Sequence, residues 1–112
     1  MESILTSIKK LLGIDAGYTH FDNDIIMHIN SVFMILTQLG VGPEEGFIIE
    51  DDQMYWEDFI ADPTKLQAVK SYVYMKVKIL FDPPLSSAVI ESYNNLIREF
   101  EWRLAFDAEH NS

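Results

Sequence analysis

Residues 66–81 read Leu66-Gln-Ala-Val-Lys-Ser-Tyr-Val-Tyr-Met-Lys-Val-Lys-Ile-Leu-Phe81. Apolar side chains recur here at steps of three and four residues, which places them along one face of a helix. This first stripe consists of Leu66, Val69, Val73, Val77 and Leu80. A second stripe, on a different face, consists of Ala68, Tyr72, Met75 and Ile79. The helix is therefore either sandwiched inside one domain or turns its second face to another subunit.

The segment Asp82-Pro83-Pro84 ends this helix, because proline donates no amide hydrogen bond and disfavours helical backbone in the residue before it. Ser86 or Ser87 can cap the helix that follows. The main stripe of this last helix consists of Val89, Tyr93, Leu96, Phe100 and Leu104, with Ile90 and Ile97 at its edge. Because the link is short, the two helices should be antiparallel neighbours.

Upstream, the sequence predicts two more helices and a short extra one. The first consists of residues 4–12 and ends at Gly13, a natural left-handed cap. The second begins with Asp22 as its cap and buries Ile25, Ile29, Val32 and Leu36, whereas Met27 and Met34 lie on the opposite side. A short helix is expected over residues 54–60, and Asp62-Pro63 should start the two-striped helix.

We therefore predict an all-α fold, a small ring-forming bundle of about four main helices with an irregular acidic loop region. A chain of 112 residues is expected to form a single domain, residues 1–112. The polar end, residues 105–112, is expected to be a flexible tail. No apolar run is long enough to span a bilayer.

Acidic residues are concentrated in the first half of the chain. The net charge is −10, and the segment from Leu11 to Thr64 contains 11 acidic residues and no Lys or Arg. Such a surface repels phosphate and disfavours ordinary nucleic-acid binding, although it would suit a wall past which DNA slides. The candidate acidic or channel-lining residues are Glu44, Glu45, Glu50, Asp51 and Asp52. The competing interpretation is a small acidic regulator, or a nucleic-acid mimic, that binds a basic partner.

Sites for chemistry are weakly indicated. His20, Asp22, Asp24 and His28 form the one cluster that resembles a metal site, but their spacing matches no ligand signature and fits a capped helix start. The chain has no cysteine, and its paired carboxylates lie in polar, loop-like sequence. We therefore predict no catalytic residue, no metal site and no cofactor, and a metal-dependent enzyme is the weakest alternative.

Aromatic residues near the end of the chain lie off the main stripe of the last helix. Trp102 and Phe106 are four residues apart, and Arg98 is one turn before Trp102, where a cation–π contact is possible. Glu99 and Arg103 are spaced for a surface ion pair. Aromatic residues beside an arginine can mark an interface, and the alternative is that they pack on the N-terminal helix of the same chain.

Several segments, in the same order, resemble the head–tail connector (adaptor) proteins of long-tailed bacteriophages. The most specific is Lys78-Ile-Leu-Phe-Asp-Pro-Pro84, and residues 42–58 match least. The segments that carry the resemblance are Ile8-Lys-Lys-Leu-Leu-Gly-Ile14, Asp24-Ile-Ile-Met-His-Ile29, Leu39-Gly-Val41, Tyr72-Val-Tyr-Met-Lys-Val-Lys-Ile-Leu-Phe-Asp-Pro-Pro-Leu-Ser-Ser87, Ile90-Glu91 and Glu101-Trp-Arg-Leu104.

The resemblance implies a structural subunit of the virion neck, made in the host bacterial cytoplasm. It implies a dodecameric ring beneath the portal protein that extends the DNA channel and docks a stopper or tail-completion protein. DNA would pass without sequence-specific binding, and no membrane, cofactor or catalysis is implied. By analogy, the portal-binding residues would be Arg98, Trp102 and Phe106. The residues expected at the subunit interface are Ala68, Tyr72, Met75, Ile79, Met27 and Met34.

Overall fold

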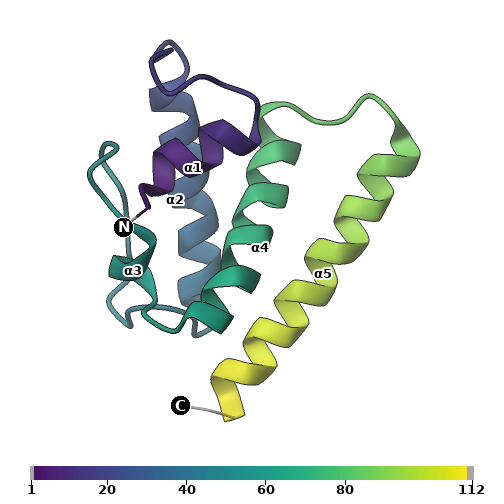
Figure 1. Cartoon of the computed structure of the whole chain (residues 1–112). Helices are drawn as coiled ribbons and strands as arrows, with labels where there is room; N and C mark the ends of the chain where they lie inside the picture. The colour runs from purple at the N-terminus through teal and green to yellow at the C-terminus, as the bar shows by residue number, and fades with distance from the viewer. Residues whose placement is uncertain (1, 111–112) are drawn as a thin grey trace.

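Residues 2–110, the part of the chain that the computed structural model describes, contain five α-helices. They are α1 (Ile4–Leu11), α2 (Asp22–Gln38), α3 (Trp56–Phe59), α4 (Pro63–Phe81) and α5 (Ser87–His110). In Figure 1, α4 lies between α2 and α5, and α1 crosses α2. Residues 2–110 contain no strand, and Ser3 and Tyr55 form an isolated bridge. The all-α prediction is confirmed.

Both apolar stripes of α4 are used within the chain. Val69, Val73 and Val77 of the first stripe are fully buried, whereas Leu80, at the end of the helix, is half exposed. Helix α5 covers the second stripe, so that Tyr72 is fully buried and Met75 nearly so, and Ala68 and Ile79 are partly buried. The prediction that this stripe meets another subunit is therefore corrected: α4 is sandwiched inside the chain, and Tyr72 and Met75 are core residues.

The ends of the helices follow the local sequence. Gly13 adopts a φ of +82° just beyond α1, a conformation that costs glycine little. The Asp62 carboxylate accepts a hydrogen bond from the Thr64 amide at 2.9 Å, with Pro63 in the first turn of α4. The Ser86 hydroxyl accepts from the Val89 amide at 3.4 Å at the start of α5. The predicted starts of α4 and α5 are confirmed.

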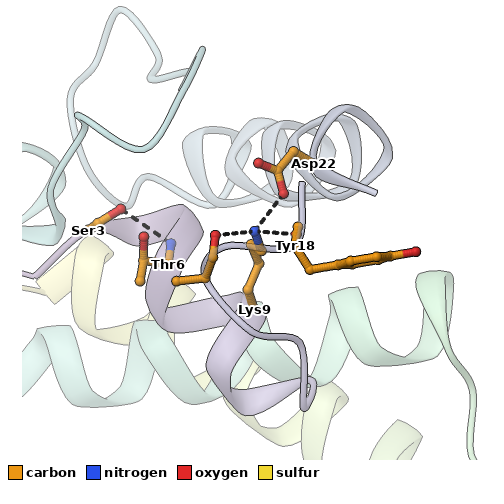
Figure 2. A network of polar contacts seen from close by, with 6 residues as sticks. Ser3, Thr6, Lys9, Tyr18 and Asp22 are labelled. Carbon is orange, nitrogen blue, oxygen red and sulfur yellow. Dashed lines mark hydrogen bonds and ion pairs between the residues drawn. The ribbon is translucent and has the colours of Figure 1, made fainter. Parts of the chain in front are cut away.

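Asp22 has a different role from the predicted one. It is the first residue of α2 rather than its cap, and its carboxylate lies 2.8 Å from the ammonium of Lys9. Lys9 is buried and also donates to the carbonyl oxygens of Ala16 (3.1 Å) and Tyr18 (2.8 Å), as Figure 2 shows. A buried ammonium needs such partners because burial removes its water. Lys9 thus holds the loop of residues 12–21 against α1 and the start of α2.

The loop after α2 is fixed by one side chain. The Asn30 amide donates to the Ile49 carbonyl oxygen at 3.0 Å and accepts from the Ile49 amide at 2.8 Å, as a neighbouring strand would. The Ile49 side chain is buried, while Ile48 beside it is exposed. Trp56 of α3 is buried and donates to the Ser7 hydroxyl at 2.8 Å, which connects α3 to α1.

Helix α5 buries only part of the predicted stripe. Leu104 is buried as predicted, and Tyr93 and Phe100 are partly buried against the core. Val89 and Leu96 are 42% and 45% exposed, whereas Ile97, expected at the edge of the stripe, is buried. The helix continues through His110, although a frayed tail was predicted, and residues 111–112 lie outside the described part of the chain. Among residues 2–110, none of the helices combines the length and apolar character that a membrane span requires.

Replacing Lys9 by Met should lower the free energy of unfolding by about 2–3 kcal/mol, because the partly buried carboxylate of Asp22 and two loop carbonyls would lose their cation. Urea unfolding monitored by circular dichroism measures the change. Lys10, the next residue in α1, is exposed. The matched variant Lys10→Met should therefore shift stability by no more than about 0.5 kcal/mol. Equal losses in the two variants would show that the Lys9 contacts do not stabilise the loop.

Candidate interaction surfaces

One exposed apolar surface lies on α2 and the loop that follows it. Met27, Met34 and Ile48 are 59%, 59% and 61% exposed. A groove of about 570 Å³ runs beside Met34, Phe47 and Ile48, with Glu45 at its rim. Met27 and Met34 were predicted at a subunit interface, and they are available for one. Ile48 was not singled out from the sequence, because its triplet of apolar residues gave no period.

A second exposed surface lies on the outer side of α5. Trp102 is 67% and Phe106 48% exposed, so the alternative in which they pack on the N-terminal helix is wrong. Their rings stack with centroids 5.3 Å apart, and the Phe106 and His110 rings stack at 4.0 Å. Three rings four residues apart thus form an aromatic ladder along one side of the helix. Exposed aromatic rings of this kind often serve as anchors for a partner.

The polar residues beside this ladder are partly paired within α5. Arg103 contacts Glu99 at 2.6 Å, which confirms the predicted surface ion pair. The Arg98 guanidinium is exposed and donates to the side chain of Asn95. Such exposed pairs contribute little to stability, so these arginines remain available to a partner.

Contacts between α4 and α5 fix which side of α5 faces outward. The Tyr72 hydroxyl donates to a carboxylate oxygen of Glu101 at 2.7 Å. Burial, and then the hydrogen bond and the negative charge of Glu101, raise the pKa of Tyr72 far above its ordinary value near 10. Burial and a hydrogen bond with Tyr93 raise the pKa of Tyr74 as well. Tyr72 therefore remains neutral and keeps donating across the interface between the helices.

The predicted acidic surface is exposed on the loop between α2 and α3. All five of its carboxylates reach solvent: Glu44, Glu45, Glu50, Asp51 and Asp52. Gln53 organises this corner, since its backbone amide donates to Asp51 at 2.8 Å and its side chain donates to Asp52 at 3.1 Å. These carboxylates form a solvated edge of the molecule, which presents negative charge to any partner that faces it.

The cluster of His20, Asp22, Asp24 and His28 takes part in packing and in an ion pair. The His20 ring lies edge-on to Phe21 at 4.8 Å, and His28 lies near Phe81 at 6.4 Å, while Asp22 is engaged by Lys9. Within residues 2–110, no group of three or more potential ligands converges in a way that could hold a metal ion. The rings of Phe21 and Phe81 also meet at 5.4 Å, which joins the start of α2 to the end of α4.

Comparison of the sequence with models of known protein families identifies the family of this all-helical chain. The family model described as phage connector protein matches residues 4–111. The chain belongs to the phage connector family. No curated protein and no solved structure matches the sequence significantly. The connector family is structural, which agrees with the predicted class of protein and makes this chain a bacteriophage structural protein.

In this connector, replacing Tyr72 by Phe should lower the free energy of unfolding by about 1–2 kcal/mol, because Glu101 loses a partly buried donor. The raised pKa of Tyr72 also predicts a pH dependence. The contribution of Tyr72 to the free energy of unfolding is complete at pH values below the ordinary tyrosine pKa of 10.0. It falls as the pH rises above that value, because Tyr72 then ionises in the unfolded chain but stays protonated in the folded one. Urea unfolding at pH 7–11 should show a steeper loss for the wild type than for Tyr72→Phe.

The matched control is Tyr18→Phe, since Tyr18 is 50% exposed. It should change stability by no more than about 0.5 kcal/mol at any pH. Identical behaviour of the two variants would mean that the Tyr72–Glu101 contact does not hold α5 on α4.

Proposed function

We propose that this connector is a head–tail adaptor that assembles as a dodecameric ring beneath the portal protein of the filled head. The ring extends the DNA channel and offers a docking surface to a stopper or tail-completion protein. It is made in the host bacterial cytoplasm and resides in the neck of the virion. The proposal has no catalytic step and requires no cofactor.

The observation that carries the proposal is the presence of two separate exposed apolar surfaces on one small chain. One lies on α2 around Met34 and the other on α5 around Trp102, and α4 lies between these two helices (Figure 1). A protein that acts alone has little reason to expose both, since water disfavours large apolar patches. A subunit of a closed ring needs different surfaces for its two neighbours and another for the protein it sits on.

We assign portal binding to the aromatic ladder. Trp102 and Phe106 supply rigid apolar area, and Arg98 adds a charge that can pair with a portal carboxylate. Met27 and Met34 remain as proposed subunit contacts. Their flexible side chains adapt to the shape of a partner.

The acidic loop residues suit the channel. DNA carries one negative charge per phosphate, and a wall of carboxylates prevents it from sticking while it passes. Glu44, Glu45 and Glu50 are exposed, and the segment from Leu11 to Thr64 that contains them has no Lys or Arg to offset this repulsion. DNA accordingly passes without sequence-specific contact.

The test is binding to the portal protein encoded by the same phage genome, measured by co-sedimentation at low and high salt. The wild type should bind at both, because an apolar contact survives the screening of charge. The double variant Trp102→Ala, Phe106→Ala should bind at least roughly 30-fold more weakly, the loss expected when an aromatic hot spot is removed. Its melting temperature should be unchanged because both rings are exposed.

The matched control is Tyr18→Ala, which removes an exposed aromatic ring far from α5 in sequence and should leave portal binding intact. Equal binding by the wild type, the double variant and the control would show that the aromatic ladder is not part of the portal interface. If the wild type fails to bind at either salt, the acidic-regulator alternative takes precedence. That alternative predicts a basic partner that is lost as salt rises.

A further inference from the structure

Helix α5 packs closely on α4 in its second half and loosely in its first. Ile97 and Leu104 are buried, whereas residues 87–96 include no buried residue. The stripe of α4 that α5 covers shows the same gradient, since Tyr72 is fully buried but Ile79, nearer the linker, is only partly buried. Figure 1 shows α5 diverging from α4 toward the linker that joins them. The interface between the two helices therefore weakens along its length.

The second half of α5 is anchored by polar contacts and by a close approach to the end of α2. The hydrogen bond donated by Tyr72 lies in this half. Asp107 lies 3.1 Å from the ammonium of Lys65, at the start of α4. Ala108 is so near the turn after α2 that a β-carbon added at Gly40 would stand 3.3 Å from its side chain. These contacts hold the second half of α5 on two other helices.

The first half of α5 has weaker support where it begins. The Ser86 hydroxyl accepts from the Val89 amide at 3.4 Å, which is long for a capping hydrogen bond. The first turn contains no acidic residue that would offset the partial positive charge of a helix N-terminus. Pro83 and Pro84 of the linker have no amide hydrogen with which to tie it down. Neither the cap nor the linker therefore fixes this half on the bundle.

We propose that residues 85–96 form a strap that opens from α4 while residues 97–110 stay docked. Segments with few buried apolar contacts open locally at a lower free energy than the rest of a domain. Tyr93, which is partly buried and hydrogen-bonded to Tyr74, holds the strap in its closed position. Ile97, the first buried residue of α5, marks the end of the strap.

The strap goes beyond the proposed function, because it is a property of the free chain. Trp102 and Phe106 lie on the docked half, so the surface assigned to the portal stays fixed on the bundle when the strap opens. Opening uncovers the part of α4 around Ile79 and frees the linker to change its path. The connector thus combines a fixed binding surface and an adjustable segment in the same helix.

Amide hydrogen exchange of the free chain, followed residue by residue by NMR, tests the strap. Residues 93–96 are the seventh to tenth of α5 counted from its start, and residues 101–104 are the seventh to tenth counted from its end. Fraying of helix ends would affect both windows alike. After correction for intrinsic rates, residues 93–96 should exchange at least roughly 30-fold faster, because the docked window waits for the core to open. Similar rates in the two windows would overturn the strap.

Two neighbouring residues give a matched pair of variants that locates the end of the strap. Ile97→Ala removes the first buried contact, so exchange of residues 98–100 should accelerate by at least roughly tenfold. Leu96→Ala, at a position that is 45% exposed, should change it by no more than about twofold. Equal effects of the two variants would contradict a boundary at Ile97. Acceleration spread evenly over α1 to α5 would show that α5 opens only together with the bundle.

These outcomes are independent of the portal assay. Failure of the wild type to bind the portal would overturn the adaptor proposal, and the difference in exchange along α5 would still support the strap. Uniform exchange along α5 would overturn the strap and leave the adaptor proposal standing.

Discussion

Burial of α4 from two directions is the constraint on which the other elements depend. Its valines pack on the side of α2, and Tyr72 and Met75 pack under α5. Each apolar side chain fully removed from water contributes about 1.5–3 kcal/mol, so a helix with two stripes is stable only when both are covered. Helix α5 therefore has to return along α4, and the proline pair at residues 83–84 provides the reversal. The positions of α1 and α3 follow, because they close the core around α2.

Three polar side chains then decide where the loops and α5 lie. Lys9 gathers two loop carbonyls and a carboxylate, Asn30 pairs with both backbone groups of Ile49, and Tyr72 donates to Glu101. Each satisfies groups that would otherwise be buried without a partner, which is costly. Their net stabilisation is modest, but they select one arrangement of a bundle whose apolar contacts are less directional.

What the core leaves uncovered is as informative as what it buries. The exposed apolar residues around Met34 on α2 and the aromatic ladder of α5 exceed what a monomer of this size needs. The connector family is structural, and exposed apolar surface of this kind can form contacts with other virion proteins. The acidic loop adds the opposite property, since it is a surface that phosphate avoids.

The sequence by itself determined the helices and several of their ends. Periodicity located α2, α4 and α5, the pair Asp62-Pro63 marked the start of α4, and the local signals were sufficient because capping and proline act within one turn. The exposure of Met27, Met34 and the acidic loop was also readable, because charged residues and the reverse side of an amphipathic helix face water. The Phage connector assignment was already visible in the order of the matching segments.

Only the tertiary structure decided which apolar surfaces are covered within the chain. Tyr72 and Met75 looked like an interface because a second stripe is the same pattern whether α5 or another subunit covers it. Val89 and Leu96 looked like core because a shift of one residue along a helix turns a side chain by only about 100°, and packing against α4 selects the rotation. Asp22 looked like a cap until Lys9 reached it from α1. Such outcomes depend on elements distant in sequence, whose relative placement no local pattern encodes.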